Sequence, residues 1–182
     1  MIMKLQISDF RFQIGFQSGV ALMAAAILTI GARAETIDRV LAVVAGQVIT
    51  LSDVMAARDL GLQSAGPAGD PVRAILTKLI DRELVLVEVD RYAPPEPLAE
   101  AVDREVQRVR DRFASQAAFD AALARSGIDD KHLRETVRQD LRMRAYLDQR
   151  FTTTDRRQTL VDDWMSGLRR RADVIDLYLT GR

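Results

Sequence analysis

The chain of 182 residues contains no cysteine and a single histidine. Without cysteine there can be no disulfide framework, no thiolate nucleophile and no cysteine-ligated metal centre. The lone His132 satisfies neither a metal site, which needs several convergent ligands, nor a serine triad. Asp129 and Asp130 stand close to it in sequence, but at a helix start they are explained as cap and dipole partners. We therefore expect a surface histidine and predict no catalytic residue, metal site or cofactor.

A surplus of charge is also missing, because 26 Lys and Arg residues balance 26 Asp and Glu residues. Proteins that bind nucleic acid neutralise phosphates with clustered positive charge. The sequence also lacks a P-loop and a convincing dinucleotide-binding glycine pattern. We therefore expect no nucleic-acid partner.

No apolar run is long enough to cross a bilayer comfortably. Val20–Ile30 has eleven residues, whereas a membrane-spanning helix needs about 20. Lys4 and Arg11 precede this run, and Ala32-Arg33-Ala34 supplies small residues two apart, as signal peptidase requires. We predict a signal peptide over residues 1–34, a periplasmic protein, and no stable membrane insertion after cleavage. The alternative is a membrane anchor.

The remaining residues, 35–182, suit one domain with a real core. Val40–Val44 is apolar and β-branched, which predicts a buried strand, followed by a turn at residues 45–47 and a short return strand, Val48-Ile49. Val174–Leu179 has the same character at the other end. A final strand without a partner would expose backbone donors and acceptors. We therefore predict that it pairs with Val40–Val44 and joins the two chain ends.

Between these strands, apolar residues at helical spacing predict about six helices, so the fold should be mostly α with a small β-sheet. Helix starts are predicted at Thr50, Asp70-Pro71, Ser115 and Asp129, and Gly127 should end one helix. The helix after Asp70 is apolar over most of its circumference, so we expect it to be the most buried one. The last helix carries Leu160, Val161, Trp164 and Leu168 on one stripe, which predicts a buried tryptophan.

Several segments, in this order, resemble the core domain of SurA-type periplasmic chaperones, from about Ile37 to Leu179. They are Ile37–Val54, Leu79-Ile80-Asp81-Arg82-Glu83-Leu84-Val85, Phe119–Leu123, Ser126-Gly127-Ile128, Leu133-Arg134 to Arg144, and Trp164–Leu179. The resemblance implies a chaperone core domain over residues 35–182. Such a domain would bind unfolded secreted or outer-membrane polypeptides and hold them soluble without ATP.

In that family, parvulin prolyl-isomerase domains stand between the helix that here ends near Phe151 and the helix that holds Trp164. A parvulin domain would need on the order of 100 residues. This chain offers Thr152–Asp155. The resemblance therefore carries over the chaperone role and not the isomerase activity. Two alternative functions remain. One is an envelope adaptor or structural protein with one specific partner, and the other is a peptidyl-prolyl isomerase, which the family name alone would suggest.

The helix from Asp129 to Phe151 carries arginines every four residues, at 134, 138 and 142, which aligns them on one face. This face lies away from the apolar stripe of Leu133, Val137 and Leu141. Arginine and tyrosine can contact aromatic side chains through stacking, and methionine adapts to variable shapes. We predict that clients bind to Arg138, Arg142, Met143, Tyr146 and Met165. The alternative is a solvated face with one exposed aromatic residue.

Overall fold

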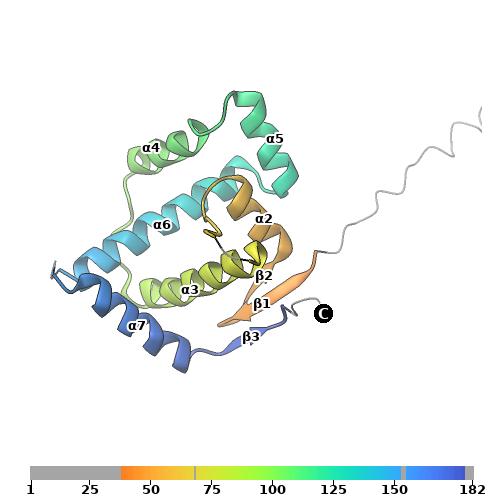
Figure 1. The fold of residues 1–182 in the computed structure, drawn as a ribbon. Helices are drawn as coiled ribbons and strands as arrows, with labels where there is room; N and C mark the ends of the chain where they lie inside the picture. Colours follow the sequence, from red (N-terminus) through yellow and green to blue (C-terminus); the bar gives the residue numbers. More distant parts are fainter. Residues whose placement is uncertain (1–37, 68, 153–154, 179–182) are drawn as a thin grey trace, which may run out of the picture. The chain divides into compact units, whose positions relative to one another are not determined.

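The structure, a computed structural model, describes residues 38–67, 69–152 and 155–178, so the predicted signal peptide lies outside it. These ranges form six helices and one three-stranded sheet, as predicted (Figure 1). The elements are β1 (Val40–Val44), β2 (Gln47–Thr50), α2 (Leu51–Asp59), α3 (Pro71–Tyr92), α4 (Ala99–Arg110), α5 (Gln116–Ser126), α6 (Asp130–Arg150), α7 (Arg157–Arg171) and β3 (Val174–Asp176). None of the described helices has the length and apolar character to span a bilayer.

The sheet has the strand order β2-β1-β3, and both pairings are antiparallel. The predicted pairing of the chain ends is confirmed, with Val44 opposite Val174 and Val43 opposite Ile175. Figure 1 shows β3 (blue) alongside β1 (orange). The β1–β2 hairpin turns at Ala45 and Gly46, which have φ values of 49° and 85°. Two consecutive positive φ values match the tight turns whose twist suits a hairpin.

Strand β3 ends at Asp176, earlier than predicted. The Leu177 N–H still donates to the Leu41 carbonyl at 2.9 Å. The backbone N–H of Tyr178 donates to the Asp176 carboxylate at 3.0 Å. This N–H is therefore bonded to a side chain and not to the backbone of a neighbouring strand. Leu179, the last residue of the predicted strand, lies outside the described residues.

The segment after β3 is fastened to the start of α3. The Tyr178 hydroxyl donates to Asp70 at 2.8 Å, and Arg73 pairs with Asp176 at 2.5 Å. The guanidinium groups of Arg39 and Arg73 lie 5.8 and 5.9 Å from the Tyr178 ring centroid, within cation–π range. The two chain ends and α3 thus form one connected unit.

The predicted helix starts are confirmed by hydrogen bonds. Thr50 and Asp53 form a reciprocal capping box on α2, because each side chain accepts from the other residue's backbone N–H. Asp70, Ser115 and Asp129 each accept from the N–H three residues on, and Gly127 ends α5 with a φ of 68°. These bonds satisfy backbone donors that would otherwise have no partner at helix starts.

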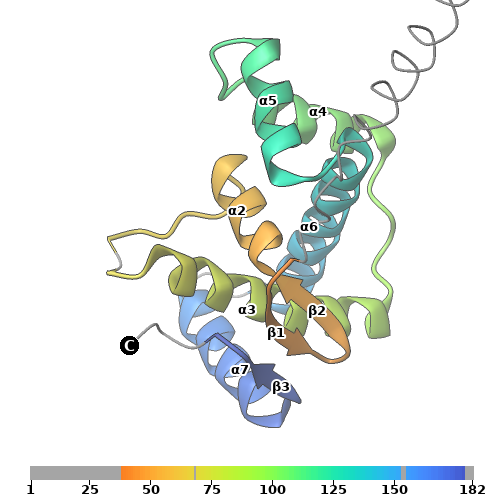
Figure 2. The same cartoon turned by 90° about the vertical axis from the view of Figure 1, so that its right-hand side faces the viewer.

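Two hydrophobic clusters lie on either side of the α3–α6 pair. The first joins the sheet to α2, α3 and α7 through residues such as Leu41, Ile75 and Leu168. The second joins α4, α5 and α6 through Val106, Phe119 and Leu133 among others. Figure 2 shows α4 and α5 at one end, α7 and β3 at the other, and α3 and α6 between them. Helix α3 has the most buried residues of the described helices, but it is also the longest. The shorter α2 and α5 bury a larger share of their residues, so the expectation that α3 is the most buried helix holds for the count alone.

The last helix is less buried than predicted. Trp164 is half-buried, and Leu160 is exposed. The reason is that α7 packs on α3 through Leu168 and Trp164, while its first turn extends beyond this contact. A third, small cluster of Val85, Val89 and Tyr146 receives the tryptophan where α3, α6 and α7 meet.

Candidate functional site

A groove of about 590 Å³ lies between α3, α6 and α7. Its lining residues on α6 and α7 recur three or four apart along each helix. That spacing places side chains on one helix face, so each helix lines the groove with a single face. The apolar part consists of Val85, Met143, Leu147, Val161 and Met165, together with Leu62 from the loop after α2. Both methionines are half-buried. The groove therefore presents flexible, polarisable side chains to solvent in a preformed hollow.

Charged residues of both signs surround this apolar lining, namely Lys78, Arg82, Arg144, Arg169, Asp81, Asp140 and Asp162. Arg169 on α7 contacts Asp81 on α3 through two hydrogen bonds of 2.7 and 2.5 Å. Arg82 on α3 donates to Asp140 on α6 at 3.0 Å. These two pairs link α6 and α7 to α3, so ion pairs between the helices help to set the width of the groove.

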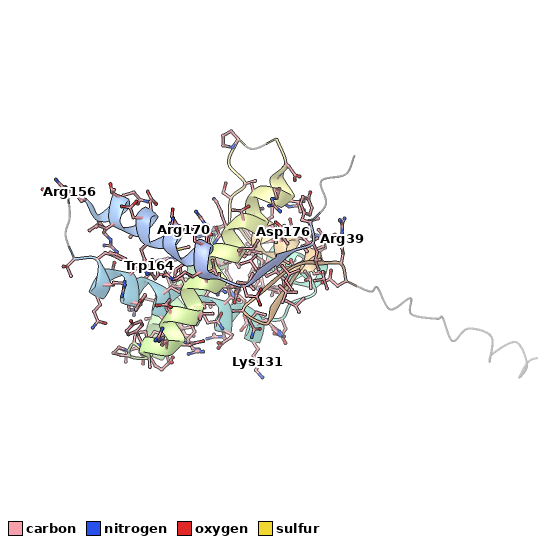
Figure 3. The ribbon with its side chains drawn as sticks, turned by 90° about the horizontal axis from the view of Figure 1, so that it is seen from below. Arg39, Lys131, Arg156, Trp164, Arg170 and Asp176 are labelled. Carbon is pink, nitrogen blue, oxygen red and sulfur yellow. The ribbon has the colours of Figure 1, made fainter. Side chains whose placement is uncertain are left out.

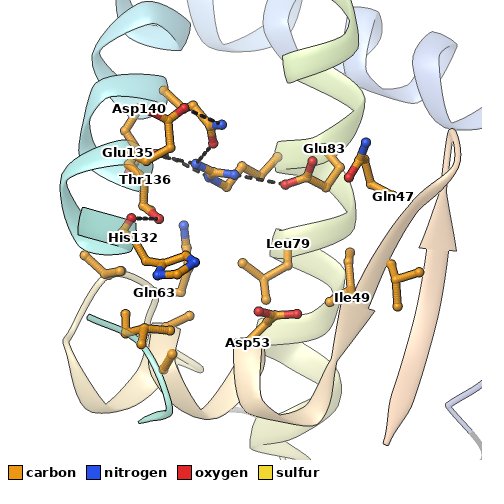
Figure 4. Close-up of a pocket in the computed structure, with 17 residues that line it drawn as sticks. Gln47, Ile49, Asp53, Gln63, Leu79, Glu83, His132, Glu135, Thr136 and Asp140 are labelled. Atoms are coloured by element: carbon orange, nitrogen blue, oxygen red, sulfur yellow. Dashed lines mark hydrogen bonds and ion pairs between the residues drawn. The ribbon is translucent and has the colours of Figure 1, made fainter. Parts of the chain in front are cut away.

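A second cavity of about 420 Å³ lies between β2, α2, α3 and α6 (Figure 4). Arg82 and Asp140 line both cavities and form part of the wall between them. Arg82 also donates to Glu83 and Gln139, each at 2.9 Å. Burial raises the pKa of Glu83, while the neighbouring Arg82 acts in the opposite direction. This second cavity has a mixed polar and apolar lining, and its only arginine is already bonded to four acceptors, Asp140, Glu83, Gln139 and the Thr136 carbonyl.

The predicted client-binding arginines do not form an open cationic surface. Arg138 bonds to Glu135 and to Glu96, and Arg142 bonds to Asp90 at 2.9 Å. The Arg142 side chain is only 11 % exposed. Hydrogen bonds that Arg138 donates to the carboxylates of Glu135 and Glu96 raise the pKa of Arg138. Both arginines therefore fasten α6 to the end of α3 and to the segment that follows it.

The expectation that Tyr146 lies on the surface is wrong, because its residue is only 5 % exposed. Its ring stacks on Tyr92 at 5.6 Å and lies 6.0 Å from the Trp164 ring. The physical reason is that the two halves of α6 pack against different pairs of helices. Its first half contacts α4 and α5 through one face, and its second half contacts α3 and α7 through another.

The structure brings Met143 and Met165 together in the α3–α6–α7 groove, although they lie on different helices. The apolar neighbours Val85, Leu147 and Val161 were missed as site residues. The positions of Leu147 and Val161 on apolar stripes were visible in the sequence, but their partial exposure follows from how far α7 diverges from α6. Whether the five predicted residues contact clients stays a prediction.

His132 lies on the surface, as predicted, with a side chain that is 71 % exposed. Its Nδ1 lies 2.7 Å from the carboxylate of Asp129, the cap of α6. The backbone N–H and the ring of His132 lower the pKa of Asp129. Among the described residues, no group of three or more histidine or carboxylate side chains could hold a metal ion.

No protein-family model and no curated protein matches this chain.

Proposed function

We propose that the protein is an ATP-independent chaperone of the periplasm that binds unfolded polypeptides in the α3–α6–α7 groove. The observation that carries the proposal is the groove lined by Met143 and Met165 together with aliphatic residues. Methionine-lined surfaces can repack around different apolar side chains, which suits a promiscuous binder. The resemblance to SurA-type core domains and the secretory character of residues 1–34 support the same function. The expected clients are secreted and outer-membrane polypeptides.

The dimensions of the groove suit a short stretch of unfolded chain. Its volume falls within the range of about 300–1,000 Å³ that is typical of ligand pockets. On α6 its lining runs from Asp140 to Leu147, a rise of about 10 Å. That length matches about three residues of extended chain at about 3.3 Å each. One or two apolar side chains of a client would therefore be buried at a time, so binding should be weak.

The charged rim explains why such a groove could release its clients. Lysine, arginine and aspartate side chains along the edges keep the apolar lining narrow. A small apolar patch buries little area, and an area of this size gives low affinity. Weak and reversible binding is what a chaperone without ATP needs.

The test is suppression of aggregation of several unrelated unfolded proteins. Replacing both groove methionines, Met143→Ala with Met165→Ala, should weaken protection about tenfold, since two buried side chains would lose contact area. Met55→Ala is the matched control, because Met55 is also half-buried but lies on α2 and does not line the groove. Equal protection by the double variant would contradict the proposal. Protection of a single client alone would favour the adaptor.

A further inference from the structure

Three aromatic rings surround one guanidinium group where α6 meets α7. The Arg150 guanidinium carbon lies 5.5 Å from the Trp164 ring centroid, 5.7 Å from that of Phe151 and 5.9 Å from that of Tyr146. The Trp164 ring itself lies 5.6 Å from Phe151 and 6.0 Å from Tyr146. We call these three rings the aromatic box. Figure 3 shows Trp164 on the side of α7 that faces α6.

Arg150 lies against the three rings and beside the Tyr146 hydroxyl, whose pKa it acts to lower, and it has no carboxylate partner among the described residues. Nearby arginines bond to carboxylates, as Arg142 does to Asp90 and Arg157 to Asp148. Arg150 has no such partner within the described ranges, and it is exposed. A cation held without a carboxylate partner is weakly fixed, because each contact with a ring contributes little. Arg150 can therefore leave the box at low cost.

A second observation at the same place is a buried polar group with no partner. Tyr146 is only 5 % exposed, and its hydroxyl makes no hydrogen bond of good geometry among the described residues. Burial raises the pKa of this hydroxyl, although the neighbouring Arg150 guanidinium acts to lower it. Buried hydroxyl groups are normally bonded. The box thus offers π faces and a hydroxyl oxygen beside the guanidinium, which are features that recognise a planar donor group.

The box and the groove are neighbours on the same helices. Met143, Leu147 and Met165, which line the groove, pack on the same small cluster as Trp164. A chain segment that places an apolar side chain in the groove could reach the box with a side chain a few residues away. This part of the inference rests on the proposed function.

We propose that the aromatic box is a binding site for an arginine side chain of a bound polypeptide, and that Arg150 occupies it in the absence of a client. Arginine fits better than lysine, because its planar guanidinium stacks on aromatic faces and donates in several directions. Arg150 then acts as an internal competitor, since only molecules with a vacant box can bind a client arginine there. Clients with an arginine near an apolar residue are preferred.

The test uses a pair of peptides that differ at one position. One carries arginine beside apolar residues, and the other carries citrulline, which has the same shape but no charge. Trp164 is the only tryptophan of the chain, so its fluorescence reports binding at the box directly. The wild-type chain should bind the arginine peptide about threefold to tenfold more tightly than the citrulline peptide. Equal affinity for both peptides would overturn the proposal. A third peptide with lysine at the same position serves as a further comparison, and tighter binding of this peptide than of the arginine peptide would also overturn the proposal.

Variants of the box sharpen the result. Arg150→Ala should bind the arginine peptide several-fold more tightly than the wild-type chain and leave the affinity for the citrulline peptide unchanged. Arg170→Ala removes the same charge from an exposed position on α7 and should change neither affinity. Phe151→Leu keeps apolar volume but removes one ring, so it should reduce the preference for arginine. An unchanged preference in Phe151→Leu would contradict the role of the rings.

A small probe separates this inference from the proposed function. Ethylguanidinium should change the Trp164 fluorescence of Arg150→Ala saturably and raise its melting temperature, because it fills the vacated box. The wild-type chain should respond only at several-fold higher concentration. If neither peptide binds but ethylguanidinium does, the result contradicts the proposed chaperone function and supports guanidinium binding in the aromatic box. If Arg150→Ala does not respond to ethylguanidinium, Arg150 is a structural tie only and the box is wrong.

Discussion

Tyr146 carries a buried hydroxyl with no hydrogen-bond partner among the described residues. Burial raises the pKa of this hydroxyl, which keeps it neutral at any physiological pH. A polar group in this state does not stabilise the fold, because it has lost water without gaining a partner. We predict that Tyr146→Phe leaves the free energy of unfolding unchanged or raises it by about 1 kcal/mol. Urea unfolding measures this change.

The control for this prediction is Tyr146→Leu, which removes the ring as well as the hydroxyl. It should lower the free energy of unfolding by about 1–2 kcal/mol, because the contacts with Tyr92 and Trp164 are lost. If Tyr146→Phe were as destabilising as Tyr146→Leu, the hydroxyl would have a bonding partner after all.

Tyr146 also shows where sequence reasoning fails at the scale of one residue. Helical spacing correctly placed it on the side of Arg138 and Arg142, away from Leu133 and Val137. Spacing gives the direction of a side chain around its own helix, but not which other helix lies there. Because α6 packs on α4 in its first half and on α3 in its second half, two different faces are buried.

At the scale of the elements, β3 ties the end of the chain to β1 and α3. Three hydrogen bonds outside the strand pairing itself illustrate the tie: Leu177 to Leu41, Ala45 to Asp173, and Tyr178 to Asp70. At about 1 kcal/mol each, ending the chain after Arg171 should lower the free energy of unfolding by about 3 kcal/mol. Denaturant unfolding of the shortened chain measures the loss, and an unchanged midpoint would show that the paired ends are not part of the cooperative fold.

Asp70 makes the stability of this tie depend on pH. The backbone N–H of Arg73 and the hydroxyl of Tyr178 lower the pKa of Asp70. A lowered pKa in the folded state means that the carboxylate contributes stability above its unfolded value of about 3.9. That contribution is lost as the pH falls through the lower folded value. We predict that Tyr178→Phe raises the pKa of Asp70, as measured by NMR titration, and an unchanged value would place the hydroxyl elsewhere.

Helix boundaries and strand pairing could be predicted because both depend on local chemistry. Thr50, Asp70, Ser115 and Asp129 bond to N–H groups only three residues away, so the signal is contained in the sequence around them. The pairing of β3 followed from a simple need, since a lone strand requires a partner. The groove could not be predicted, because its width depends on contacts between α3 and α7 that are far apart in sequence.

At the scale of the whole molecule, the proposed periplasmic location depends on removal of residues 1–34. Basic residues, the apolar run Val20–Ile30 and the small residues before Glu35 motivate this expectation. We predict that the exported protein begins at Glu35, as shown by N-terminal sequencing. A membrane fraction that retains Val20–Ile30 would contradict a periplasmic protein without an anchor.

The absence of room for a parvulin domain leads to a prediction about catalysis. Only a short segment separates α6 from α7, where the SurA-type chaperones that the sequence resembles carry their isomerase domains. We predict that the purified chain does not accelerate cis–trans exchange of an X-Pro peptide, which takes roughly 10–100 s at 25 °C without a catalyst. Acceleration by a preparation free of host isomerases would show an active site elsewhere in the chain.

The most direct test of polypeptide binding in the groove is photocrosslinking in living cells. A photoreactive residue is placed at Val161, which lines the groove, and in a second protein at Arg125, an exposed position on α5 outside it. If the groove binds unfolded clients, the residue at 161 crosslinks to several different secreted or outer-membrane polypeptides, and the residue at 125 does not. Crosslinks to one folded partner alone, or equal crosslinks from both positions, would contradict a chaperone that works through this groove.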